Sequence, residues 1–412
     1  MKEFNITGIC IPQRHYMADI THKLDEIAEL VNKGKYFTIN RSRQYGKTTT
    51  LYMLEQRLSS EYEVLSVSFE GMSEKSFLSS RNFVKTLISK VSSAMEYTTV
   101  PDELKKQWKN TDDFLENSDI DDFEYLSKKI TLLCRQSDKN IVLMVDEVDK
   151  SSDNQIFLNF LGMLRDKYLQ SAKGRDNTFK SVILAGVYDI KNLKLKIRSD
   201  EEKKYNSPWN VAVDFKVDMS FSPQEIAAML EDYEKDYHIG MDIKSVSDEL
   251  YFLTDGYPYL VSWLCKWIDE EENREFTRHN IQKAEKAIHF SDSTLIDDVI
   301  KNYENEPMLG KMIDEILFEG KKYPFVRTDT VVNLGVRLGI FSKKDDSVGI
   351  SNIIFEKVLM DHILLKKARE NSLLQPEKKQ FVHDGKLDME QVLTKFPQIM
   401  KSEYRSEDGK FI

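Results

Sequence analysis

The chain has 412 residues, a length that allows about two to four domains, and 41% of them are hydrophobic, enough for ordinary buried cores. Its formal net charge of −10 argues against a protein whose whole surface lies on nucleic acid or on an anionic membrane. Three widely spaced cysteines and the lack of a long apolar stretch or apolar leader predict a soluble, cytoplasmic protein without a membrane partner.

Hydrophobic periodicity predicts alternating strands and helices over the first half of the chain. An amphipathic helix around Ile20–Val31 comes first, before any strand. Strands are predicted at Tyr36–Ile39, Glu63–Phe69, Ile141–Val145, Ser181–Val187 and Val211–Val217, and helices up to about Leu58 and at Asn154–Leu169. This alternation is typical of a parallel α/β sheet.

Residues 35–50, KYFTINRSRQYGKTTT, predict a short strand, a loop and the start of a helix. A helix N-terminus offers unpaired backbone N–H groups and a partial positive charge, which suit a phosphate. Gly46 would allow close approach, Lys47 would place an ammonium near the β- and γ-phosphates, and Thr48 could ligate Mg²⁺. The residues predicted to contact ATP here are Arg43, Gln44, Tyr45, Gly46, Lys47, Thr48 and Thr49. Arg43 could equally point to water, and an exposed glycine–lysine turn is the alternative interpretation of the tripeptide.

The motif departs from the consensus G-x-x-x-x-G-K-[ST] at its first position, where this chain has Arg41. The missing glycine predicts a turn with a different backbone shape. Phosphate contacts depend more on the residues nearer the helix. We therefore expect Arg41 to shape the turn without binding phosphate strongly, and a change to glycine to be tolerated.

A second motif lies about a hundred residues further on. Five apolar residues, Ile141–Val145, predict a central parallel strand that is buried on both faces. Asp146 and Glu147 follow at once, and because carboxylates are costly in a core, we expect them at the carboxyl edge of the sheet. Asp146 would orient Mg²⁺ or its water opposite Thr48, and Glu147 would polarise the attacking water as the catalytic carboxylate. An acidic helix cap is the alternative for this segment alone, but the two motifs together predict MgATP binding.

After Ser220 the predicted elements are mostly helices, beginning with a proline at the first helical position in Ser222-Pro223-Gln224-Glu225. Near the end, Gly-Ile-Phe, a polar turn and Val-Gly-Ile are typical of a winged helix. Its expected recognition segment, Asp329–Ile340, has Arg337 as its one basic residue, which favours a lid or protein-binding role over DNA. The predicted domains are an N-terminal preface (1–34), a P-loop ATPase core (35–220), a helical lid (221–300), a winged helix (301–366) and a polar extension (367–412).

The segments NRSRQYGKTTTL, VLMVDEVDK, VILAGVYDI and TDGYP, with the winged-helix pattern, resemble AAA-like ATPases of bacteria and archaea, close to STAND-type and archaeal P-loop ATPases. The resemblance covers about residues 5–365. It implies a sheet of the additional-strand type, in which one strand separates the strand of Asp146 from the P-loop strand. It also implies a sensor strand at Val182–Gly186, Tyr188 and Asp189 near the γ-phosphate, and Pro258 near the adenine. Some relatives continue into a PD-(D/E)xK-like nuclease domain, which we expect this chain to lack.

Two functions from different classes follow. The first is an ATPase that acts as a nucleotide-dependent switch; a homo-oligomer is possible, in which Arg198 would stabilise transition-state charge in trans. Arg198 also fits a plain basic loop, balanced by Asp200–Glu202. The second is a nucleotide-binding, DNA-associated regulator with little turnover. Glu147 favours the ATPase, because a pure binder does not need a water-orienting carboxylate.

Overall fold

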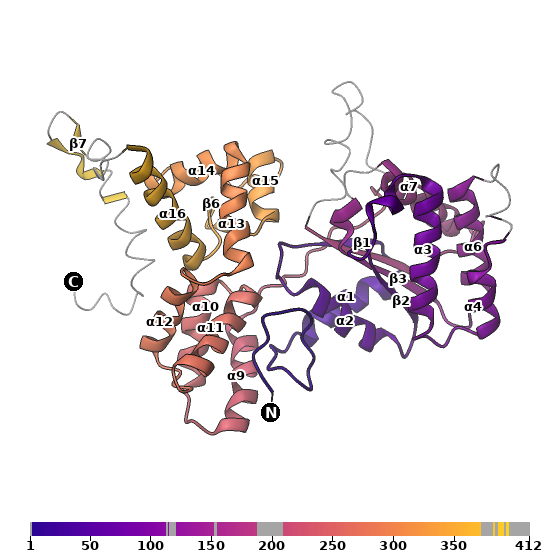
Figure 1. Cartoon of the computed structure of the whole chain (residues 1–412), viewed down its shortest axis with the longest axis horizontal. Coiled ribbons are helices and arrows are strands. Elements are labelled where there is room, and N and C mark those ends of the chain that lie inside the picture. Colours follow the sequence, from indigo (N-terminus) through magenta and orange to yellow (C-terminus); the bar gives the residue numbers. More distant parts are fainter. Residues whose placement is uncertain are drawn as a thin grey trace. The chain divides into compact units, whose positions relative to one another are not determined.

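The computed structural model in Figure 1 describes residues 2–112, 114, 121–151, 155–187, 209–371, 382–383, 386–390 and 393–394. The chain folds into two compact units. The sheet unit consists of Thr7–Ile11 and Asp19–Met219, and the helical unit of Met1–Ile6, Pro12–Ala18 and Ser220–Ile412. The first 34 residues are therefore shared between the two units.

A four-stranded parallel sheet forms the centre of the sheet unit. Its strands are β1 (Phe37–Asn40), β2 (Glu63–Ser68), β3 (Ile141–Asp146) and β4 (Ser181–Gly186), in the order β1-β4-β3-β2. β4 lies between β1 and β3, so one strand separates the P-loop strand from the strand of Asp146. Asn40 pairs with Gly186 and Ser68 with Asp146, which brings the carboxyl ends of all four strands to one edge.

The strand predicted at Val211–Val217 is wrong. The segment begins in a turn, and from residue 214 its exposed residues alternate with more buried ones, which is the pattern that suggested a strand. It pairs with β1 through a single parallel bridge, Phe37 with Val213, and one backbone hydrogen bond from Val213 N to Tyr36 O (2.8 Å). A strand needs consecutive bridges, and those are not formed here.

Helices cover both faces of the sheet (Figure 1). They are α1 (Thr21–Asn32), α2 (Lys47–Leu58), α3 (Ser80–Met95), α4 (Asp102–Lys109), α6 (Asp122–Gln136) and α7 (Gln155–Ala172), with short 3₁₀ turns η1 (Glu74–Phe77) and η2 (Val148–Ser151). On one side α2 contacts β2 and β4, and α1 packs on α2. On the other side α3, α4, α6 and α7 form a large apolar core with the sheet. All six residues of β3 are buried, as expected for a central parallel strand.

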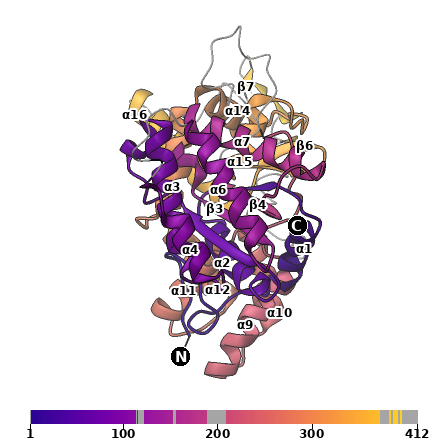
Figure 2. The same cartoon turned by 90° about the vertical axis from the view of Figure 1, so that its right-hand side faces the viewer.

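The helical unit contains seven helices before a short hairpin, in the described part of the chain. They are α9 (Pro223–Tyr237), α10 (Ile243–Thr254), α11 (Pro258–Glu271), α12 (Arg278–Ile288), α13 (Thr294–Asn305), α14 (Pro307–Phe318) and α15 (Thr330–Arg337). The antiparallel hairpin β5 (Phe341–Lys344) and β6 (Ser347–Ile350), helix α16 (Ile353–Asn371), and the two-residue strands β7 (Val382–His383) and β8 (Lys386–Leu387) follow. α9 and α10 pack side by side (Figure 2).

The predicted start of α9 is confirmed in detail. The Ser222 hydroxyl accepts from Glu225 N (3.2 Å), and the Glu225 carboxylate accepts from Ser222 N (2.7 Å). With proline at the first position, this is a complete capping box.

An aromatic cluster attaches the N-terminal residues to α9. The ring of Phe4 stacks on Tyr233 with centroids 5.1 Å apart, and Tyr16 meets the same ring edge-on at 5.1 Å. The Tyr16 hydroxyl donates to Asp236 (2.7 Å), which lies one turn further along α9. Phe4 and Tyr16 are almost completely buried, so these N-terminal residues are part of the core of the helical unit.

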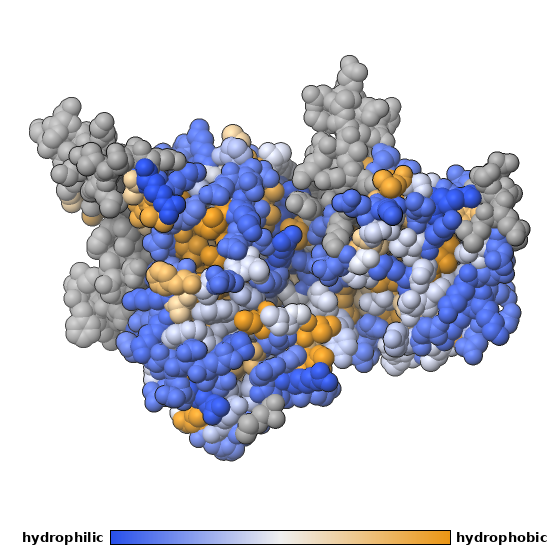
Figure 3. Space-filling model, viewed as in Figure 1, coloured by the Kyte–Doolittle hydropathy of each residue, from blue (hydrophilic) through white to orange (hydrophobic). Residues whose placement is uncertain are grey.

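The face shown in Figure 3 is mainly hydrophilic, with separate apolar areas. The most exposed large apolar side chains are Leu78 and Tyr97 in the sheet unit and Phe290 and Met308 in the helical unit. Single exposed apolar side chains are common on soluble proteins and do not by themselves mark a binding surface. No helix in the described part of the chain combines the length and apolar character needed to cross a membrane.

The helical unit depends on a glycine at position 256. Gly256 has φ +71°, and a Cβ there would lie 2.0 Å from the carbonyl oxygen of Phe221. Gly256→Ala should therefore lower the melting temperature strongly, because backbone atoms would have to move. Gly240→Ala is the matched control, because Gly240 has φ +73° and no atom within 4 Å of a built Cβ. It should cost only about 1 kcal/mol of conformational strain. Equal losses in thermal denaturation would contradict the close contact.

Candidate functional site

The loop between β1 and α2 ends with a glycine in the left-handed region. Gly46 has φ +75°, caps the N-terminus of α2, and has no atom within 4 Å of a built Cβ. A side chain there would strain the turn and would project into the space in front of the helix. Gly46 therefore places no side chain between a phosphate and the backbone N–H groups at the start of α2.

Lys47 is buried beneath this loop. Its ammonium donates to the backbone carbonyls of Arg41 (3.0 Å) and Ser42 (2.9 Å), so the side chain curls back along the inside of the loop. Burial lowers the pKa of Lys47, and nearby carboxylates, of which Glu147 has the largest effect, act in the opposite direction. The ammonium thus lies in a poorly solvated position where an anion would interact with it strongly.

Thr48 and Asp146 are brought together as predicted. The Thr48 hydroxyl donates to Asp146 Oδ2 at 2.7 Å, which joins the start of α2 to the end of β3. Asp146 is buried, and its second oxygen, Oδ1, accepts from Glu147 N at 2.9 Å. An adjacent hydroxyl and carboxylate provide the hard oxygen ligands that Mg²⁺ prefers, so these two residues fit a magnesium–nucleotide complex.

Glu147 follows Asp146 in an uncommon backbone conformation, with φ +54°. A non-glycine residue in the left-handed region carries local strain, which is frequent at functional sites. Burial raises the pKa of Glu147, the charge of Asp146 raises it further, and Lys47 acts in the opposite direction. Glu147 is partly buried, and the charge of Lys47 acts on it.

Two contacts at this edge were not predicted from the sequence. Asp149 lies on η2, and one of its carboxylate oxygens accepts from Val187 N at 2.6 Å, just after β4. The backbone N–H of Cys10 donates to the hydroxyl of Thr49 at 3.1 Å, which places the N-terminal segment Thr7–Ile11 beside α2. Asp149 was visible as a third acid in the run VDEVD, whereas no pattern in the sequence pointed to Cys10.

The other predicted site residues are placed as follows. Arg43 is exposed on the loop, and its charge contributes to lowering the pKa of Lys47. Pro258 is buried in the helical unit as the first residue of α11. Tyr188, Asp189 and Arg198 lie outside the described residues.

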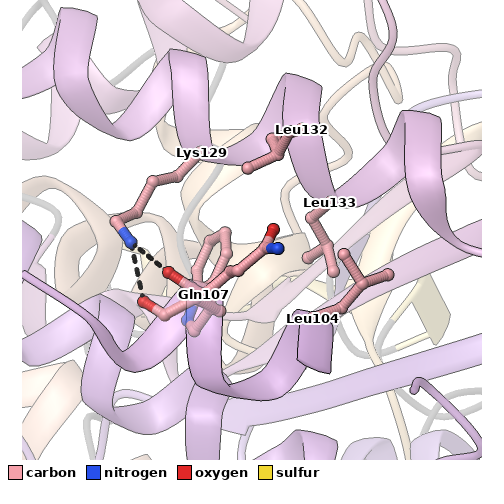
Figure 4. Close-up of a pocket in the computed structure, with 6 residues that line it drawn as sticks. Leu104, Gln107, Lys129, Leu132 and Leu133 are labelled. Atoms are coloured by element: carbon pink, nitrogen blue, oxygen red, sulfur yellow. Dashed lines mark hydrogen bonds between the residues drawn. The ribbon is translucent and has the colours of Figure 1, made fainter. Parts of the chain in front are cut away.

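A pocket between α4 and α6 has a structural explanation (Figure 4). It is lined by Leu104, Gln107, Trp108, Lys129, Leu132 and Leu133. The ammonium of Lys129 donates to the carbonyls of Gln107 (2.7 Å), Trp108 (2.9 Å) and Asn110 (2.6 Å). These carbonyls lie at the C-terminal end of α4, where a cation satisfies unpaired acceptors and the helix dipole. The lysine therefore joins two helices.

The chain shares its fold with a Walker-type ATPase of known structure. The Walker-type ATPase PABY2304 of Pyrococcus abyssi is 14% identical, with a TM-score of 0.58, and the match covers 87% of this chain and 99% of that protein. The ORC2 protein of Aeropyrum pernix, solved in ADPNP–ADP complexes, is 11% identical over 89% of this chain and 98% of its own, with a TM-score of 0.46.

No curated protein sequence matches the chain. The family model described as an AAA-like domain matches residues 11–360, which include the sheet unit from Ile11 onwards and most of the helical unit. This match spans the P-loop and the strand that carries Asp146 and Glu147. The chain therefore belongs to the AAA-like domain family.

Proposed function

We propose that the protein binds MgATP at the P-loop and hydrolyses it with Glu147 as the catalytic carboxylate. The observation that carries this proposal is the hydrogen bond of 2.7 Å between Thr48 and Asp146, beside the buried ammonium of Lys47. It unites a helix start suited to phosphates with a pair of magnesium-binding oxygens. Family membership and the fold shared with a Walker-type ATPase support the same function.

Each residue has a distinct role in the proposed reaction. Lys47 and the N–H groups of residues 43–49 would hold the β- and γ-phosphates, and Thr48 with Asp146 would hold Mg²⁺, which neutralises charge on the phosphate oxygens. Glu147 lies next in the chain, where it would orient a water molecule for attack on the γ-phosphate. In a homo-oligomer, Arg198 of one copy would stabilise the transition-state charge in the site of another copy.

We further propose that the protein is a nucleotide-dependent switch. Its parts are a sheet of the additional-strand type, a helical lid and a winged helix. The strand order β1-β4-β3-β2 supports the first part. The succession of α14, α15 and the hairpin β5–β6 supports the winged helix, and Pro258, at the start of α11, would belong to the lid and lie near the adenine. Nucleotide exchange or hydrolysis would change the populations of lid conformations.

DNA binding by the winged helix receives little support from the charges around the hairpin. Lys343 pairs with Asp346 (3.1 Å), and Lys344 pairs with Asp255 (3.0 Å). Lys321 pairs with Glu315 at 3.0 Å. Because DNA binding rests on cations that meet phosphates, a protein partner or a second copy of the chain is the better candidate.

Lys47→Ala should weaken ATP binding about 10- to 100-fold or more, because a buried charge-assisted contact to the phosphates is lost. Isothermal titration calorimetry with MgATP measures the change. Lys128→Ala is the matched control: Lys128 forms an exposed ion pair with Glu124 on α6, and its removal should leave affinity unaltered. An unchanged affinity in the Lys47 variant would overturn the P-loop assignment.

Glu147→Gln separates binding from chemistry. The amide keeps the size of the side chain but cannot accept a proton, so ATP should bind while phosphate release falls by about 10²-fold or more. Asp146→Asn should instead weaken binding of the magnesium complex, because Asp146 is the proposed metal ligand. If wild-type protein and the Glu147→Gln variant release phosphate at the same rate, the alternative regulator with little turnover replaces the ATPase.

The raised pKa of Glu147 predicts an acidic limit to activity. The carboxylate form acts as the base, so kcat should fall as pH decreases through a pKa above the ordinary value of 4.5. Steady-state phosphate release between about pH 8 and pH 5 measures this fall in kcat. The residual rate of the Glu147→Gln variant should not fall in this way as pH decreases. If the pH dependence of the rate is parallel in the two proteins, another group causes the fall.

A further inference from the structure

Residues 209–219 are the last part of the sheet unit and lie beside its edge strand β1. The indole N–H of Trp209 donates to the hydroxyl of Thr38 (3.0 Å), and the ring of Phe215 stacks on Phe37 with centroids 5.9 Å apart. Val213 N adds the backbone hydrogen bond to Tyr36 O. This exit segment ends at Met219, the last residue of the sheet unit. It is therefore held by individual contacts, since the consecutive bridges of a strand are not formed.

Arg41 makes the last of these contacts, at the position where the consensus motif has glycine. Its guanidinium donates to Val217 O at 2.6 Å and to its neighbour's carbonyl, Asn40 O, at 2.8 Å. It also lies over the ring of Phe215, 5.4 Å from the centroid. The planar guanidinium donates to the two carbonyls from two separate nitrogens and lies over the ring, a geometry that a glycine lacks and that the single ammonium of a lysine does not reproduce.

The backbone of Arg41 belongs to the P-loop at the same time. Its N–H donates to Gly186 O (3.1 Å), at the end of β4, and its carbonyl accepts from the ammonium of Lys47 (3.0 Å). Two successive hydrogen bonds therefore connect the P-loop lysine with Val217, which lies two residues before the end of the sheet unit.

We infer that Arg41 is a positioning residue that transmits the occupancy of the P-loop to the exit segment. The inference rests on the proposed binding of ATP. The ammonium of Lys47 has three donors, and two of them go to Arg41 O and Ser42 O, so contacts to both the β- and γ-phosphates would compete with these carbonyls. The backbone at Arg41 then shifts, and the guanidinium carries the shift to Val217. The ligand that drives the change is the phosphate chain of a nucleotide.

The experiment is hydrogen exchange of residues 209–219 in the full chain, with and without a non-hydrolysable MgATP analogue. Calorimetry with the same analogue determines affinity separately. In the wild type, the analogue should change exchange at Val213 and its neighbours. Arg41→Gly should bind the analogue within about threefold of the wild-type affinity, but exchange there should be about tenfold faster without it and no longer respond to it.

Two further variants keep the test informative if the glycine variant folds poorly. Arg41→Lys retains the charge but replaces the planar guanidinium with a single ammonium, and Phe215→Leu removes the ring beneath Arg41 without changing a residue of the P-loop. Both should reduce the response of the exit segment to the analogue. Arg57→Ala is the matched control, because Arg57 forms a partly exposed ion pair with Asp25 between α1 and α2 and should leave the response as in wild type.

The outcomes separate the two proposals. If the wild type does not bind the analogue, the proposed function fails, and transmission fails with it. If the wild type binds but exchange at 209–219 does not respond, or if Arg41→Gly responds like the wild type, transmission alone is overturned. A loss of affinity in Arg41→Gly as large as that expected for Lys47→Ala would make Arg41 a phosphate ligand and would also overturn the inference.

Discussion

The hydrogen bond between Thr48 and Asp146 joins two residues 98 positions apart, and the site depends on it. It can form because β1, β4 and β3 are parallel and in register, so the turns that follow them meet at one edge. The helix start supplies a hydroxyl, and the buried strand supplies a carboxylate. A shift of one residue in β3 would point Asp146 to the opposite face of the sheet and separate the two groups.

Lys47 and three carboxylates lie close enough at this edge to influence one another's charge. Burial acts against the charged forms of both Lys47 and Glu147, and each of the two makes the charged form of the other more favourable. Asp146 and Asp149 add negative charge around the lysine. The proposed ligand, MgATP, would bring both phosphate charge and a cation to this group.

Patterns within short stretches predicted much of the fold. The strands β1 to β4 and helix α9 lie where periodicity and capping residues placed them, because burial on two faces and a capping box are encoded locally. The meeting of Thr48 and Asp146 was also predicted, from a motif pair. The strand at Val211–Val217 was not correct, because alternation reports burial and does not report hydrogen bonding. The contacts of Arg41 with Val217 and of Cys10 with Thr49 involve backbone atoms of distant segments, which leave no trace in residue identity.

The aromatic cluster around Tyr233 has a consequence for the modularity of the chain. Phe4 and Tyr16 complete the core of the helical unit, whereas Thr7–Ile11, between them, belongs to the sheet unit. Neither unit is therefore encoded by one uninterrupted stretch of sequence. A fragment that begins at Ser220 would lack two core aromatic rings and leave apolar surface of α9 exposed. An exchange of units between related proteins would have to divide the first eighteen residues between the two units, because this short segment contributes to both.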